Sequence, residues 1–150
     1  GNVSAYFPEE GILFSSDTIL ANAKYGFVPD YHIANFVKFM RGFLDLEWQT
    51  FVPGRYELTD KAGFSRGCDY IEAIQLESQN AFAEFVPIWA FDPMQGYVGG
   101  KLRERFGDLD GFEEHIGQTS LRIVHHYLMG GWGLEDTADA EVMLADQVEL

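Results

Sequence analysis

Two adjacent histidines, His125 and His126, interrupt the apolar stretch LRIVHHYLMGGWG of residues 121–133. Neighbouring residues on a helix point about 100° apart, so the pair does not converge on one metal ion. A two-histidine zinc helix needs a second ligand four residues away, and neither histidine has a histidine or carboxylate at that spacing. We therefore expect a helix that packs Ile123 and Val124 inward, with both histidines on its solvated side and no metal or other cofactor.

A second candidate for chemistry is GFSRG at residues 63–67, which fits the G-x-S-x-G pattern with Ser65 as the nucleophile. That motif requires a strand before it, a helix after it and a large parallel sheet, whereas the preceding TDKA is polar turn material. We interpret it as a glycine-rich connection between hairpins. Cys68 lacks the sequence context of a cysteine hydrolase, which favours a partly buried structural thiol. Neither motif supports a catalytic function, so we favour a protein that is not an enzyme and leave the question open.

Carboxylates are the most abundant candidates, since 24 acidic residues face 10 basic ones and give a net charge of −14. If the segments around residues 67–78 and 81–91 are paired strands, Asp69, Glu72, Glu84 and Asp92 line one side of a sheet. Paired carboxylates suit glycoside hydrolysis, metal binding or contact with a cationic partner, and their spacing does not choose among these.

The acidic balance argues against direct binding of nucleic acid, because phosphates are repelled. It favours a basic protein partner. A single cysteine excludes an internal disulfide and fits a reducing, cytoplasmic setting. No apolar run is long enough to cross a membrane, and no membrane association is expected. The pattern leaves the oligomeric state open.

Hydrophobic periodicity predicts the elements that must position these residues. Apolar residues recur at three- and four-residue steps over about residues 30–45, with Asp30 as the first cap, and again over about residues 111–129, where Asp110 and Glu113 are spaced as a capping box. A short acidic C-terminal helix is expected after residue 137. Short strands are expected at VSAYF and GILF near the start.

The middle of the chain is harder to assign. Pro53 and Gly54 form a turn dipeptide between strand-forming residues, which predicts a β-hairpin over residues 48–59. Residues 67–80 are ambiguous between helix and strand, and we favour a strand that turns at SQN into a second strand over residues 81–91. The glycines near residue 100 are assigned to a loop or bulge.

Together these elements predict one α+β domain over residues 1–150, with a largely antiparallel sheet of about four to six strands. Two main helices, at about residues 30–45 and 111–129, and the short C-terminal helix would pack the sheet.

Three functions remain open. The first is a non-catalytic acidic domain that engages a basic protein, as inhibitors, immunity proteins and nucleic-acid mimics do. The second is a small-molecule-binding or hydrolytic domain with a pocket between sheet and helices. The third is a structural subunit of a larger assembly. For the first two, the candidate binding residues are Asp69, Glu72, Glu84, Trp89, Asp92, His126 and Tyr127.

The order of VPDYHIANFVKFM, FVPIWAFDPMQGYVG and GFEEHI resembles a family of domains that includes many toxin immunity proteins. That resemblance implies a non-catalytic inhibitor. The Asn-Gly-Gly expected after the first helix of that family is missing, because RGFLDLEW stands there instead. No residue roles are carried over from the family.

Overall fold

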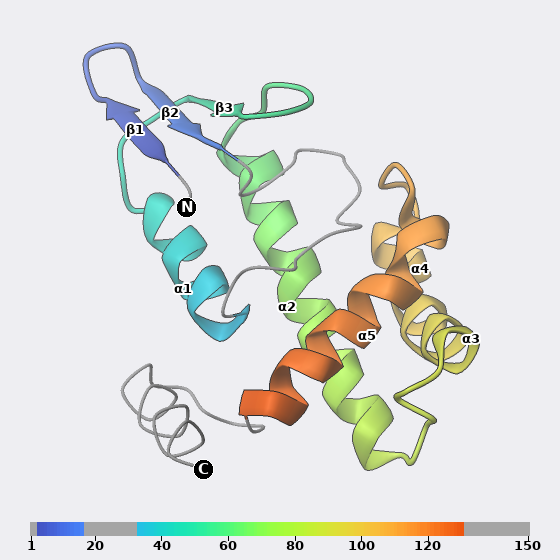
Figure 1. The fold of residues 1–150 in the computed structure, drawn as a ribbon. Coiled ribbons are helices and arrows are strands. Elements are labelled where there is room, and N and C mark those ends of the chain that lie inside the picture. Colours follow the sequence, from blue (N-terminus) through green and yellow to red (C-terminus); the bar gives the residue numbers. More distant parts are fainter. Residues whose placement is uncertain (1–2, 17–32, 131–150) are drawn as a thin grey trace, which may run out of the picture.

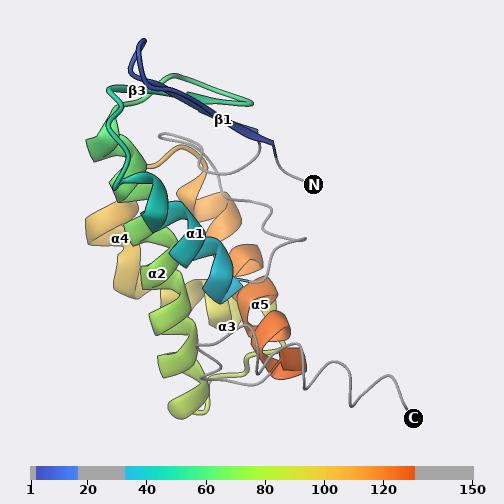
Figure 2. The ribbon, with the colours of Figure 1, turned by 90° about the vertical axis from the view of Figure 1, so that its left-hand side faces the viewer.

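The computed structural model describes residues 3–16 and 33–130 of the chain. Side chains are described for residues 3–16 and 35–125. The elements follow in the order β1 (Ser4–Phe7), β2 (Ile12–Ser15), α1 (Ile33–Phe43), β3 (Thr50–Pro53), α2 (Lys61–Ala83), α3 (Phe91–Met94), the π-helix η1 (Gln95–Gly99), α4 (Gly100–Phe106) and α5 (Phe112–Gly130). A small sheet forms one end of the molecule, and the helices lie beneath it (Figures 1 and 2).

The sheet has the order β1-β2-β3, with β1 antiparallel and β3 parallel to the central β2. Leu13 lies opposite Phe51, and both side chains are fully buried on the face that meets the helices. After β3 the chain turns back far enough for Thr59 to form a single antiparallel bridge with Phe51. The hairpin expected over residues 48–59 is therefore reduced to one bridge without a second strand.

The long helix α2 occupies the place where a strand pair was predicted. Asp60 caps its start, because the carboxylate accepts a hydrogen bond of 2.9 Å from the backbone N–H of Gly63. Its buried side chains recur every three or four residues along its length, as a helical face requires, and they include Phe64, Cys68, Ile71, Ile74, Ser78 and Ala81. This repeat runs through the whole segment and outweighs the short stretch of alternate spacing that suggested a strand.

The segment from α3 through η1 to α4 is one continuous helical run that packs against α5. Glycines make the approach close. A Cβ at Gly117 would lie 2.8 Å from the Cβ of Gln95 and 3.1 Å from the ring of Phe91, and a Cβ at Gly99 would lie 3.2 Å from Ile116. The glycines expected in a loop near residue 100 are therefore helical, and two of the chain's glycines serve helix packing.

Aromatic side chains join the sheet to α2 in the core. Phe64 makes edge contacts with Trp48 and Phe51, at ring-centre distances of 5.4 and 4.7 Å. Farther along α2, Tyr70 packs on Phe106 at 5.2 Å and so joins α2 to α4. The high aromatic content is thus used largely to connect the layers.

The predicted fold class is wrong in its sheet. The described residues form three strands rather than four to six, and one of the two pairings is parallel. Residues 67–91, assigned to two strands, form most of α2, its connection and the start of α3. The two N-terminal strands and the helices at 33–43 and 112–130 are confirmed. Asp30 and the C-terminal helix lie outside the described residues.

Candidate functional site

The predicted binding residues do not line one side of a sheet. Asp69 and Glu72 lie near the middle of α2, whereas Glu84 lies at its far end, Trp89 in the connection to α3 and Asp92 in α3. The structure therefore divides them into two groups with different surroundings. His126 and Tyr127 belong to α5, but their side chains lie outside the described ones.

The first group is an ion-pair network around Arg41 of α1. The Arg41 guanidinium donates to both carboxylate oxygens of Glu72, at 3.0 and 2.6 Å, and to Asp69 at 2.5 Å. It also donates to the Ser65 hydroxyl at 3.1 Å, while Arg105 of α4 contacts Asp69 at 3.3 Å. Hydrogen bonds with Glu72 raise the pKa of Arg41 and keep it charged. Asp69 and Glu72 therefore join α1 and α4 to α2 as paired structural groups.

Neither Ser65 nor Cys68 has the environment of a nucleophile. Ser65 lies in the first turns of α2 and accepts a hydrogen bond from Arg41, with no strand leading into it. Burial raises the pKa of the Cys68 thiol to about 12, which keeps it protonated near neutral pH. The interpretation of Cys68 as a structural thiol agrees with this geometry, whereas the GFSRG segment is helical and not a connection between hairpins.

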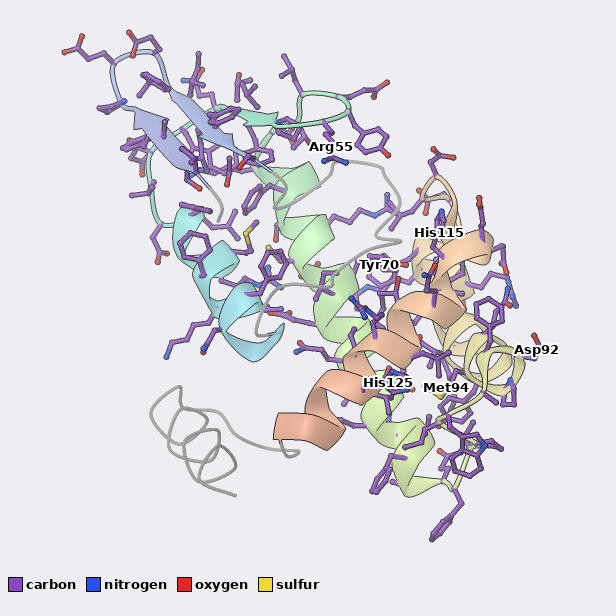
Figure 3. The ribbon with its side chains drawn as sticks, viewed as in Figure 1. Arg55, Tyr70, Asp92, Met94, His115 and His125 are labelled. Atoms are coloured by element: carbon purple, nitrogen blue, oxygen red, sulfur yellow. The ribbon has the colours of Figure 1, made fainter. Side chains whose placement is uncertain are left out.

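The histidine pair lies on α5, as predicted. Ile123 and Val124 are fully buried and His125 is exposed, so the inward and outward faces fall where the helical wheel places them. His115, one of the residues labelled on α5 in Figure 3, is half-buried and lies 3.7 Å from the carboxylate of Glu114. Among residues with described side chains, no group of three or more histidine, cysteine, aspartate or glutamate residues could hold a metal ion.

The second group surrounds an unusual helix end. Helix α2 ends in a Schellman motif, in which Val86 N–H donates to the Ala81 carbonyl at 2.9 Å and Phe85 N–H donates to the Phe82 carbonyl at 3.2 Å. The motif places Phe85 in the left-handed region, at φ 59°. Glycine is the usual residue at this position because it has no Cβ to clash there. The Phe85 side chain is 92% exposed, so packing of its ring within the chain does little to offset that backbone strain.

Exposed aromatic rings continue from this helix end into α3. Phe82 is 48% exposed, Trp89 77% and Phe91 41%. We call Phe82, Phe85, Trp89 and Phe91 the terminal aromatic surface. It runs from the end of α2 farthest from the sheet, along the connection, to the start of α3 (Figure 1). Four large exposed rings within ten residues of the sequence make this part of the chain the candidate contact surface.

Acidic groups border the terminal aromatic surface. Glu84 and Asp92 are both exposed, and Figure 3 shows Asp92 at the periphery of the helical layer. The nearby Glu84 carboxylate also raises the pKa of Tyr97 to about 12. Neither Glu84 nor Asp92 has a basic partner among the described residues.

Of the residues predicted to line a pocket between sheet and helices, the structure describes the side chains of Trp89 and Asp92 but not those of His126 and Tyr127. Trp89 and Asp92 are exposed at the surface. A shallow hollow of about 490 Å³ lies instead beside β3, lined by Gln49, Thr50, Leu58, Thr59 and Asp60. None of these residues was predicted as a binding residue. No helix among the described residues has the length and apolar character needed to span a membrane.

Comparison with known proteins places this chain near the subunits of one enzyme. It is 31% identical over 145 residues to 2,4-dinitroanisole O-demethylase subunit beta of Nocardioides sp. (strain JS1661), covering 95% of this chain and 45% of the relative. It is 29% identical over 137 residues to subunit alpha from the same strain, covering 91% of this chain and 42% of that relative. The chain thus spans less than half the length of these relatives. No family model matches it, and no solved structure matches it significantly.

Proposed function

We propose that this chain forms part of a subunit of a multi-subunit enzyme related to 2,4-dinitroanisole O-demethylase. The observation that carries this proposal is that one chain aligns over nearly all its length with both the alpha and the beta subunit. The two subunits therefore share a region that resembles this chain. By analogy, the partner of this chain is a polypeptide that carries the same region. Among the three functions left open by the sequence, this favours the subunit of a larger assembly.

Within such an assembly, we assign the described residues a contact role. The most unusual surface they present is aromatic and exposed, as subunit interfaces are before assembly. Asp69, Glu72 and Ser65 are held by arginine, which makes them poor candidates for free acid-base groups or nucleophiles. In this proposal the chain contributes a contact surface and structural support to the enzyme.

Affinity capture from the native host tests the proposal. The tagged chain is purified under mild salt, and its companions are identified by mass spectrometry. A companion counts as support only if its own sequence aligns with this chain, as the alpha and beta subunits do. Light scattering coupled to gel filtration then gives the stoichiometry, because the isolated chain has a mass of 17.0 kDa.

The expected result is a complex of fixed stoichiometry with a related polypeptide. The complex, and not the chain alone, is expected to release a phenol from an aryl methyl ether such as 2,4-dinitroanisole. A chain that stays at its monomer mass and brings down no related polypeptide would refute the proposal. Equal demethylation by the chain alone would contradict the contact role.

A further inference from the structure

We infer that the terminal aromatic surface is the docking site for a partner polypeptide that presents an apolar pocket bordered by lysine or arginine. The inference rests on the proposed function, because it names the surface through which this chain would join a related subunit. It goes further by assigning the contact to Phe85 and Trp89 as anchors and to Glu84 and Asp92 as the charged border.

Exposure identifies the anchors. Phe85 is 92% exposed and Trp89 is 77% exposed, which leaves most of each side chain available to a partner. Aromatic side chains offer a large apolar area with few rotatable bonds, and tryptophan is among the residues most enriched at the energetic centres of interfaces. Phe82 and Phe91, each about half exposed, extend the same surface on either side.

The backbone at Phe85 provides independent support. The hydrogen bonds of Val86 and Phe85 to Ala81 and Phe82 complete the helix end whichever residue stands at position 85. Glycine would satisfy this geometry without strain, yet a phenylalanine at φ 59° presents its ring to the outside. Strained residues cluster at functional sites, so the backbone conformation of Phe85 adds to the exposure of its ring as support for a contact there.

The charge around the surface indicates the character of the partner. Between Arg66 and Lys101 the sequence contains no lysine, arginine or histidine, but it contains five acidic residues, Asp69, Glu72, Glu77, Glu84 and Asp92. Asp69 and Glu72 pair with Arg41 and Arg105, and Glu77 accepts a hydrogen bond from Asn80. Glu84 and Asp92 remain for a partner. Complementarity therefore requires basic groups on the other side.

A second copy of the same chain fits this surface poorly. Two copies that met through the terminal aromatic surface would bring Glu84 and Asp92 of one chain toward the same carboxylates of the other. The net charge of −14 on each copy adds to that repulsion. A related subunit with basic residues around its apolar pocket could bind the same rings without this electrostatic repulsion.

The test measures affinity for the purified related polypeptide obtained by capture. Phe85→Ser and Trp89→Ala remove the anchors, and Glu84→Gln with Asp92→Asn removes the charged border. Leu58→Ser is the matched control for Phe85→Ser, because Leu58 is also exposed, at 63%, but lies near the sheet at the other end of the molecule. Circular dichroism melts of each variant confirm that it is folded before titration.

Each anchor variant is expected to weaken binding by about 10-fold or more, as substitutions at interface centres do, whereas Leu58→Ser leaves affinity unchanged. The double amide variant is expected to reduce the dependence of affinity on salt. If the anchor variants and the control bind the related polypeptide as tightly as the parent chain, the docking site is wrong while the subunit proposal stands.

Two other outcomes also decide the question. If the parent chain captures no related polypeptide, the subunit proposal fails and the docking inference fails with it. If the isolated chain dimerises at micromolar concentration and Phe85→Ser makes it monomeric, the surface binds a second copy, which overturns the basic partner inferred here.

Discussion

Replacing Phe85 with glycine should stabilise the isolated chain, although the change deletes an aromatic ring. The left-handed conformation at φ 59° costs a residue with a Cβ about 1–2 kcal/mol. Glycine removes this cost but gains freedom in the unfolded state, which offsets about 0.4–1 kcal/mol. The difference between glycine and alanine at position 85 should therefore be about 1 kcal/mol in favour of glycine.

The lost ring subtracts little from this gain. Phe85 is 92% exposed, so less than a tenth of its surface is buried. For a ring of this size the buried part is about 20 Å², which corresponds to about 0.5 kcal/mol. Phe85→Gly should thus be more stable than the parent chain by about 0.5 kcal/mol, and Phe85→Ala should be less stable by a similar amount.

Urea unfolding followed by circular dichroism measures these differences, with Phe85→Ala as the matched control that lacks the ring but keeps the Cβ. In thermal melts the two variants should differ by about 3 °C for a chain of this length. Both variants should lose affinity for the partner, so stability and binding move in opposite directions for glycine. A Phe85→Gly variant no more stable than Phe85→Ala would refute the claim that backbone strain is stored there.

Three further predictions concern the contacts between helices and the buried thiol. Arg41→Met should lower the free energy of unfolding by about 1–2 kcal/mol in urea titrations, because Glu72 loses its bidentate partner while solvent limits the penalty. Its effect should shrink in the Glu72→Gln background, and an equal loss in both backgrounds would contradict the pairing. Gly117→Ala should lower the melting temperature, since its Cβ would meet that of Gln95 at 2.8 Å, and an unchanged melt would show that α5 shifts freely. Cys68 should react with a thiol reagent at pH 8 only after unfolding, because burial raises its pKa to about 12, and rapid labelling of the folded chain would refute this.

The aromatic anchor at position 85 shows what sequence reasoning missed. Trp89, Glu84 and Asp92 were selected from their residue types, and the structure places all three between the end of α2 and the first turn of α3. Phe85 was not selected, because in a predicted strand an apolar residue is expected and carries no signal. Only the end of α2 reveals it as a ring in a left-handed backbone conformation.

Arg41 was missed for a different reason. Its partners, Asp69 and Glu72, are 28 and 31 residues away, so no local pattern connects them. A carboxylate pair three residues apart on one helical face is a signal for a basic partner, but that signal required residues 67–80 to be read as helix. The strand interpretation hid it.

Local patterns alone determined the helices at 33–43 and 112–130, the two short N-terminal strands and the outward direction of His125. These features depend on hydrophobic spacing over one or two helical turns or on alternation within a strand, which the sequence displays directly. The tertiary structure decided the long helix α2, the parallel pairing of β3 and the division of the carboxylates into paired and free groups. Each of these features depends on the residues, remote in the sequence, against which a segment packs. Burial between the sheet and the helices overrides the local helix or strand propensity where the two conflict.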